Sequence, residues 1–227
     1  KATCQATVTV VDTTPPSIAC PTSTVVECQS NLQAMVSIPL ATASDVCGVV
    51  TIANSHNGGG ANASGSYPLG TTVVTFTATD GSGNTSSCQT SVTVRDTIPP
   101  TITAAASPSV LWPPNHKMWN INATVVARDI CDPNLAVTLF SAMSSEPNGS
   151  DDIQGAAIGT PDFQVQLRSE RDGGGTGRVY TLTYKATDRS SNGSTSSALV
   201  NVPHDMRDKK TEPIDLKLDG AHSTVVL

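Results

Sequence analysis

Residues 7–10 read Thr7-Val8-Thr9-Val10, and residues 91–94 read Ser91-Val92-Thr93-Val94. In both stretches small polar residues alternate with β-branched apolar residues, which is typical of a strand with one buried face. The same alternation runs through residues 73–79 and 179–184, and turn clusters such as Asp80-Gly81-Ser82-Gly83-Asn84 separate the stretches. No segment sustains the 3.6-residue period of an amphipathic helix. The sequence therefore predicts an all-β protein.

The chain contains an internal repeat. Residues 4–18 recur as residues 88–102, and both copies contain Cys-Gln, Val-Thr-Val, Asp-Thr, Pro-Pro and Ile at matching positions, 84 residues apart. Two further sets of positions correspond. At the same offset of 84, Ala43, Asp45 and Cys47 match Ala127, Asp129 and Cys131. At an offset of 108, Asp80 and Asn84 match Asp188 and Asn192. Self-similarity at this period indicates a tandem array, and the larger offset indicates an insertion in the second repeat.

The repeat sets the expected domains. We expect tandem immunoglobulin-like or fibronectin-III-like β-sandwiches over residues 12–96 and 97–205, joined by a short Pro-Pro linker. Residues 1–11 are expected to be an orphan strand that belongs to a preceding repeat or is donated to a neighbour. Residues 206–227 are expected to form a C-terminal tail, in which residues 214–218 alternate apolar and charged side chains like a strand. Because residue 1 falls within a strand-like segment, we expect the natural N-terminus to lie upstream.

The composition excludes several classes of protein. The 227-residue chain has a net charge of -6, a pI near 5.0 and only 14% charged residues, and residues 2–94 contain no Lys or Arg. Nucleic-acid binding needs clustered basic residues, so we exclude it. No apolar run approaches the roughly 20 residues that a membrane-spanning helix needs. Six cysteines in a chain rich in Ser and Thr instead favour a secreted or cell-surface protein, because disulfides persist outside the cytosol.

Several motifs resemble known extracellular modules. The first repeat contains Asp12-Thr13-Thr14-Pro15-Pro16, Tyr67-Pro68-Leu69-Gly70-Thr71-Thr72 and Ala78-Thr79-Asp80, and in these motifs it resembles the hyalin repeat (HYR). This resemblance implies an immunoglobulin-like fold and a non-enzymatic role associated with adhesion. The second repeat is similar to a divergent immunoglobulin-like module of secreted bacterial proteins, through Leu111-Trp112-Pro113-Pro114-Asn115-His116-Lys117 and Val202-Pro203-His204-Asp205. Fold analogy alone does not establish a function.

The six cysteines leave their pairing open. The first repeat contains four of them, which allow two bridges in any of three pairings: Cys20, Cys28, Cys47 and Cys88. Cys4 precedes that repeat, and Cys131 keeps its repeat position in the second repeat, where the other three cysteine positions are lost. Cys4 and Cys131 are expected either to be free, buried thiols or to bond to each other, within one chain or between subunits.

The turns between the last two strands of each repeat are candidate calcium sites. In an immunoglobulin-like sandwich this turn lies near the start of the first strand, so two groups are expected to form: Asp12 with Asp80 and Asn84, and Asp96 with Asp188 and Asn192. Carboxylate and amide oxygens of this kind suit Ca²⁺. The alternative is an Asx turn, in which the aspartate accepts hydrogen bonds from its own backbone and binds no metal.

A weaker calcium candidate is the acidic loop of Glu146, Asp151, Asp152 and Asp162, whose carboxylates could equally pair with Arg168 and Arg171. No other cofactor and no catalytic residue is expected. Five Asn-x-Ser/Thr sequences are candidate glycosylation sites: Asn62, Asn84, Asn122, Asn148 and Asn192.

These features favour a structural or adhesive module over the alternative, a carbohydrate-binding or spacer module of a larger secreted enzyme. Residues 3–11 place Cys4, Ala6, Val8 and Val10 on one face, and an unpaired strand of this kind can add to a neighbouring sheet. We therefore expect head-to-tail self-association into an extracellular filament, with Cys4 and Cys131 locking neighbours, or binding to other extracellular proteins or glycans.

Overall fold

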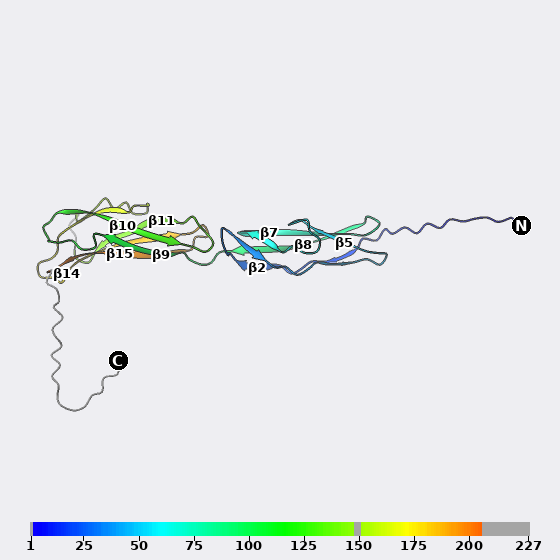
Figure 1. Ribbon diagram of the computed structural model, residues 1–227, viewed down its shortest axis with the longest axis horizontal. Helices are drawn as coiled ribbons and strands as arrows, with labels where there is room; N and C mark the ends of the chain where they lie inside the picture. Colours follow the sequence, from blue (N-terminus) through cyan, green and yellow to red (C-terminus); the bar gives the residue numbers. More distant parts are fainter. Residues whose placement is uncertain (1, 148–150, 206–227) are drawn as a thin grey trace, which may run out of the picture. The chain divides into compact units, whose positions relative to one another are not determined.

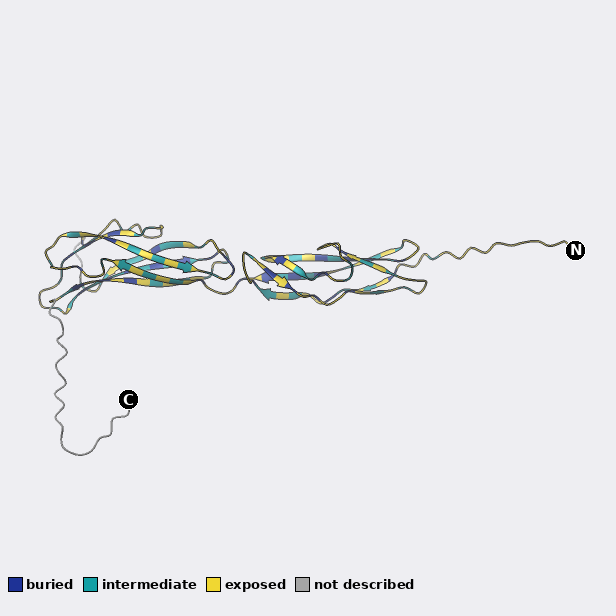
Figure 2. Cartoon of the chain, viewed as in Figure 1, coloured by how far each residue is buried: buried dark blue, intermediate teal, exposed yellow. Residues whose placement is uncertain are grey.

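The computed structural model describes residues 2–147 and 151–205, and this part of the chain contains fifteen β-strands and no helix (Figure 1). The predicted all-β class is confirmed. Buried and exposed residues alternate along the long strands (Figure 2), as expected where one face of a strand packs inward. In β14 (Gly177–Thr187) every second residue from Arg178 onward is buried. The described residues include no helix with the length and apolar character to cross a membrane.

The first repeat folds into eight strands: β1 (Ser17–Ala19), β2 (Thr24–Glu27), β3 (Gln33–Val36), β4 (Thr42–Ser44), β5 (Thr51–Asn54), β6 (Gly65–Pro68), β7 (Gly70–Thr79) and β8 (Thr85–Arg95). They pair as a four-stranded sheet in the order β2-β8-β7-β5 and as two two-stranded sheets, β3-β6 and β1-β4. β7 and β8 are antiparallel, and their register runs from Gly70 opposite Val94 to Thr79 opposite Thr85. This hairpin positions the turn at residues 80–84.

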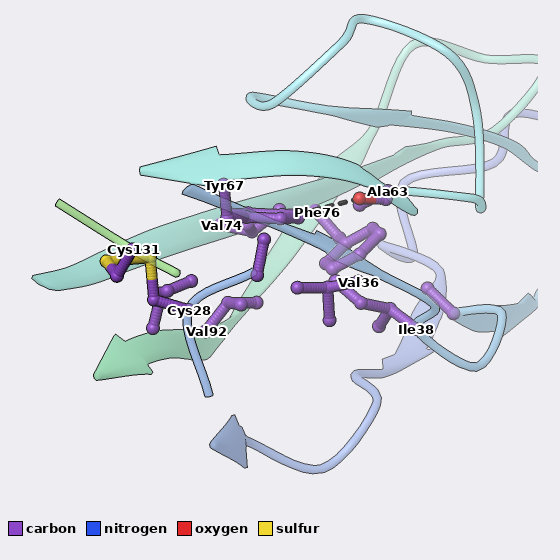
Figure 3. Packing of buried hydrophobic residues seen from close by; sticks show 12 residues of the cluster. Cys28, Val36, Ile38, Ala63, Tyr67, Val74, Phe76, Val92 and Cys131 are labelled. Atoms are coloured by element: carbon purple, nitrogen blue, oxygen red, sulfur yellow. Dashed lines mark hydrogen bonds between the residues drawn. A yellow bond between two sulfur atoms is a disulfide. The ribbon is translucent and has the colours of Figure 1, made fainter. Parts of the chain in front are cut away.

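The core of this repeat is built on the same hairpin (Figure 3). Phe76 of β7 and Val92 of β8 are at most 1% exposed, and burying side chains of this size contributes about 1.5–3 kcal/mol each. Tyr67 of β6 is fully buried beside them, and its hydroxyl donates a hydrogen bond to the carbonyl oxygen of Ala63 at 2.6 Å. Burial raises the pKa of the Tyr67 hydroxyl, so this group remains a donor at neutral pH.

Tyr67→Phe is expected to lower the free energy of unfolding by about 1–2 kcal/mol, because it leaves the carbonyl of Ala63 without its partner. The matched control is Tyr184→Phe: the hydroxyl of Tyr184 is also buried, but it has no hydrogen-bond partner. Removing it should be neutral or slightly stabilising. Denaturant unfolding of both variants measures the difference, and equal losses would show that the Tyr67 hydrogen bond has no net effect.

The second repeat has seven strands: β9 (Thr101–Ser107), β10 (Met118–Arg128), β11 (Ala136–Ser144), β12 (Ile153–Gln154), β13 (Gln164–Arg168), β14 (Gly177–Thr187) and β15 (Gly193–Pro203). They form two sheets, β12-β13-β10-β9 and β11-β14-β15. The two longest strands of the second sheet, β14 and β15, are consecutive in the chain and pair directly, so the turn that joins them corresponds to the turn between β7 and β8.

The chain divides into two compact units that do not follow the repeat boundaries. The first unit contains Lys1–Thr103, Val126–Thr138 and Lys185–Ser196, and the second contains the rest of the described chain. The boundaries at residues 11, 96 and 205 therefore stay a prediction. Residues 2–11 were expected to be a strand, but they belong to no strand and are exposed. The C-terminal tail, residues 206–227, lies outside the described residues, and so does its expected strand-like segment at 214–218. The glycosylation candidate Asn148 also lies outside them.

Candidate metal centre

The turn after β14 is organised by Asp188 and Asn192. The Oδ1 atom of Asp188 accepts a hydrogen bond from the backbone N–H of Asn192 at 2.8 Å, and its Oδ2 atom accepts one from the side-chain amide of Asn192 at 2.9 Å. The same amide donates to the backbone carbonyl of Asp96 at 3.1 Å. All three residues belong to the first compact unit. The structure thus brings Asp96, Asp188 and Asn192 together. Because the Asp188 side chain accepts the backbone N–H of Asn192, the alternative of an Asx-type turn also describes the Asp188 side of this arrangement.

A third carboxylate joins this group from the turn that follows β10. The Oδ1 atom of Asp129 accepts hydrogen bonds from the backbone N–H groups of Cys131 and Asp132, at 2.7 and 2.8 Å. One carboxylate oxygen from each of Asp96, Asp129 and Asp188 lies within 4.8 Å of the other two. Asp129 was not assigned to this site from the sequence, and neither was its repeat counterpart Asp45 to the first site, because only the turns between the last two strands were considered.

The electrostatics of this cluster are unusual for buried acids. Asp96 and Asp188 are 8% and 6% exposed, and no ion pair among the described residues includes either of them or Asp129. The Oδ2 atoms of Asp96 and Asp129 are buried and accept no hydrogen bond. Burial, together with the negative charges of Asp129 and Asp188, raises the pKa of the Asp96 carboxyl, against the opposing effect of hydrogen bonds from the Ile98 backbone and the Ser190 side chain. Three neighbouring carboxylates thus lack a compensating positive charge.

The corresponding turn of the first repeat has the same hydrogen bonds. The side-chain amide of Asn84 donates to the carbonyl of Asp12 at 3.3 Å and to Oδ2 of Asp80 at 2.8 Å. The second of these bonds is the main reason that the pKa of the Asp80 carboxyl is lowered. Asp12, Asp45 and Cys47 also lie within 4.8 Å of one another, but none of the three is buried.

The disulfides correct the predicted pairings. Cys20 bonds to Cys88 and Cys28 bonds to Cys131, with Cα–Cα distances of 5.8 and 5.4 Å. The first repeat therefore does not hold two bridges of its own, and the pairing of Cys4 with Cys131 is wrong. The backbone N–H of Leu32 donates to the carbonyl of Cys131 at 2.9 Å, so the turn that carries Cys131 lies against the segment that follows Cys28. Two cysteines remain as exposed thiols, Cys4 and Cys47, so the expectation that Cys4 and Cys131 are free, buried thiols is also wrong.

The acidic loop after β11 is neutralised by arginine. Arg178 is 5% exposed and forms ion pairs with Asp152 at 2.7 Å and with Glu146 at 3.1 Å, while Arg168 pairs with the other oxygen of Asp152 at 3.0 Å. The backbone carbonyl of Asp151 accepts a hydrogen bond from Arg168. The geometry therefore argues against calcium at Glu146, Asp151 and Asp152.

The arginines that bind this loop differ in part from those expected. Arg168 pairs with the loop as the sequence suggested, but Arg171 donates its hydrogen bonds to the carbonyls of Asp172, Pro203 and His204. The main partner of the loop is Arg178, which sequence analysis did not assign to it. Its alternation with Tyr180 and Leu182 on the inward face of β14 was the signal that could have found it.

The candidate glycosylation sites fall into two groups. The side-chain nitrogens of Asn84 and Asn192 donate the hydrogen bonds that hold the two acidic turns, so a glycan on either nitrogen would disrupt that turn. Asn62 and Asn122 are exposed. These two stay candidates for glycosylation.

These features define a class of protein: tandem β-sandwich repeats with disulfide bonds and acidic turns at matching positions. Residues 11–94 match the HYR domain. The chain is also 41% identical over 107 residues to Hyalin of Strongylocentrotus purpuratus, in an alignment that covers 44% of this chain and 8% of Hyalin. The resemblance of the first repeat to the hyalin repeat is confirmed, and that of the second repeat to a bacterial module stays a prediction.

Solved structures that align with this chain include the fibronectin(III)-like modules of Clostridium thermocellum CbhA, at 15% identity and a TM-score of 0.29 over 83% of this chain and 94% of that one. Mouse Cadherin-23 EC22-24 aligns at 16% identity and a TM-score of 0.34 over 84% of this chain and 65% of that one. TM-scores this low support no inference, so the fold class rests on the strands described above.

Proposed function

We propose that this chain is a non-enzymatic, structural and adhesive module of an extracellular protein, and that it continues a linear array of hyalin-type sandwiches. The HYR match over residues 11–94 and the 41% identity to Hyalin support an adhesion-type module. The two disulfides support an extracellular location, because such bonds persist outside the cytosol.

The observation that carries this proposal is the contrast between residues 2–11 and their repeat counterpart in β8. Val8 and Val10 are 85% and 91% exposed, whereas Val92 and Val94 in the equivalent positions are 1% exposed. Burying the two exposed valines would contribute roughly 3–6 kcal/mol. A segment with one exposed apolar face and unpaired backbone groups is suited to strand addition. We therefore infer that residues 2–11 act as the last strand of a further hyalin-type sandwich.

The partner that fits is a hyalin-type sandwich that lacks its own last strand. A second copy of this chain, which the sequence suggested, is a poorer fit because the place for such a strand, between β2 and β7, is already filled by β8. Cys20 and Cys28 of that copy are also already bonded. Repeated in one direction, the pairing of a donated strand with an incomplete sandwich gives an open linear array.

The exposed thiols point to the same partner. Cys4 is the repeat counterpart of Cys88, and Cys47 is the repeat counterpart of Cys131. Because both counterparts are in disulfides, we expect Cys4 and Cys47 to bond to cysteines at the Cys20 and Cys28 positions of the partner. Each bond joins two thiols, and their two hydrogens reduce one molecule of a disulfide oxidant, such as oxidised glutathione, to two thiols.

A fusion protein tests this proposal. A second copy of residues 12–85 placed directly before Ala2 supplies the partner in register, because Ser86 is the counterpart of Ala2. This copy adds three cysteines to the six of the chain. After refolding with oxidised glutathione, we expect one free thiol in the fusion, against two in the unextended chain. Mass spectrometry should then link Cys4 and Cys47 to the added copy, and finding both as free thiols would refute the proposal.

The matched control changes only the strand register. Inserting one threonine between Thr7 and Val8 turns both valines to the opposite face of the strand, since side chains alternate with a period of two. This variant of the fusion should retain more free thiols than the fusion in register. An equal thiol count in the two proteins would mean that the cysteines pair without strand addition.

A further inference from the structure

We propose that Asp96, Asp129 and Asp188 form a binding site for one Ca²⁺ ion. The three residues come from separate parts of the chain: Asp96 directly follows β8, Asp129 follows β10 and Asp188 follows β14. All three belong to the first compact unit. This inference concerns turns at the end of the first repeat and within the second, and it does not rest on the proposed array.

The strongest support is the pair of buried carboxylate oxygens that have no partner. Asp96 is more than nine-tenths buried, and its Oδ2 atom accepts no hydrogen bond. Asp129 is half-buried, but its Oδ2 atom is buried and also accepts no hydrogen bond. A buried polar atom without a partner is destabilising, and more so when it is charged, so two of them within one acidic cluster are unusual. A bound cation would compensate both.

The chemistry and spacing of the site select the kind of ion. Its three known donors are carboxylate oxygens, which suit the hard cations Ca²⁺ and Mg²⁺ rather than zinc or copper. Ca²⁺ holds its oxygens at about 2.3–2.6 Å, so oxygens on opposite sides of the ion lie about 4.6–5.2 Å apart. One carboxylate oxygen from each of the three aspartates lies within 4.8 Å of the other two, so the three oxygens can share one Ca²⁺. Mg²⁺ demands near-ideal octahedral geometry at about 2.0–2.1 Å, so we expect it to bind more weakly than Ca²⁺.

Hydrogen bonds to the three aspartates hold their side chains in position. Oδ1 of Asp129 accepts two backbone N–H groups, and Oδ1 of Asp188 accepts the N–H of Asn192. Oδ1 of Asp96 accepts the N–H of Ile98 at 3.3 Å. Asp96 and Asp129 are thus each fixed through Oδ1 and keep Oδ2 for an ion. Both oxygens of Asp188 accept hydrogen bonds from Asn192, so Asp188 would contribute a remaining lone pair of an oxygen that is already hydrogen-bonded. A preorganised site of this kind loses less conformational entropy on binding.

We do not propose a calcium site in the first repeat. Its group of Asp12, Asp45 and Cys47 is more exposed, and a thiol there takes the position that Cys131 occupies in the second repeat. The charge of Asp12 is the main cause that raises the pKa of the Cys47 thiol. Sulfur is a soft donor, whereas Ca²⁺ takes oxygen ligands, so Cys47 does not complete a calcium site. The two groups therefore provide an internal comparison within one chain.

Calorimetric titration of the EDTA-treated full chain with CaCl₂ tests the site. We expect Asp96→Asn, Asp129→Asn and Asp188→Asn each to weaken binding at least about tenfold, because Ca²⁺ affinity depends on the number of charged ligands. Asparagine keeps an oxygen acceptor for the turn and removes only the charge. The control Asp172→Asn makes the same change at an exposed position outside the cluster and should leave binding unchanged. No heat of binding, equal loss in the control, or tighter binding of Mg²⁺ would overturn the proposal.

Thermal unfolding separates loss of the site from loss of the fold. Saturating CaCl₂ is expected to raise the Tm of the wild-type chain by about 5 °C or more. It should leave the Tm of Asp96→Asn unchanged. In EDTA, where no ion is bound, Asp96→Asn should melt at the same temperature as the wild type or higher. The substitution relieves the repulsion among three carboxylates that have no positive partner. An equal rise in Tm for both proteins in CaCl₂ would place the ion elsewhere and refute the site.

Discussion

Removing the bond between Cys28 and Cys131 is expected to lower the free energy of unfolding by about 4–5 kcal/mol, which is the largest effect we expect from altering a single interaction. The bond closes a loop of 103 residues, and the conformational entropy that a crosslink removes from the unfolded chain grows with loop length. Both cysteines are buried, at 4% and 1% exposure, so Cys28→Ala with Cys131→Ala keeps the site apolar and leaves no unpaired thiol.

Denaturant unfolding of this double variant measures the effect. The matched control is Cys4→Ala with Cys47→Ala, which also replaces two sulfurs but removes only exposed thiols. Surface substitutions of this kind usually change stability by less than about 0.5 kcal/mol. If the two double variants lost the same stability, the crosslink would contribute nothing beyond the side chains themselves.

Arg178→Met is expected to cost about 3–5 kcal/mol, because it leaves buried carboxylates without their main positive partner. Burial alone would lower the pKa of the Arg178 guanidinium, but its hydrogen bonds to Tyr180, Asp152 and Glu146 outweigh that effect and raise the pKa. Asp152 would keep Arg168, whereas Glu146 would lose its only ion pair among the described residues. Methionine retains much of the volume, so the loss would come from charge and hydrogen bonding.

The control for this prediction is Arg128→Met, since Arg128 is exposed and no ion pair among the described residues includes it. It should change the free energy of unfolding by less than about 0.5 kcal/mol. Equal losses for Arg178→Met and Arg128→Met would show that the ion pairs of Arg178 with Asp152 and Glu146 contribute nothing to stability.

The fold class could be predicted because strand alternation is a local signal. In β14 the inward positions from Arg178 to Ala186 alternate with partly exposed ones, and such a period of two can be seen in the sequence. The repeat was equally visible, and it correctly brought Asn84 to Asp12 and Asn192 to Asp96. These contacts follow from topology, since the turn between two paired strands must return to the end of the sheet where the repeat begins.

The cysteine pairing could not be predicted in the same way. Counting cysteines within one repeat assumed that each repeat closes its own bridges, but Cys28 bonds to Cys131 across the repeat boundary. The survival of Cys131 alone in its repeat was a signal of this, because a cysteine without a local partner points to a distant one. Likewise the role of Asp129 depends on how a turn after β10 lies against the end of β8, and no pattern of residue types records that contact.

The bond between Cys28 and Cys131 has a consequence for a chain that is pulled at its two ends. A covalent crosslink transmits force directly between the residues that it joins, so the polypeptide between them stays slack. The 103 residues of separation correspond to roughly 360 Å of extended chain, at about 3.5 Å per residue, which tension cannot release while the bond is intact. Strands β3 to β10 all lie between the two bonded cysteines in the sequence. Reduction of this bond would thus lengthen the contour available under load without cutting the backbone, and the full length would become available only when the overlapping Cys20–Cys88 bond is reduced as well.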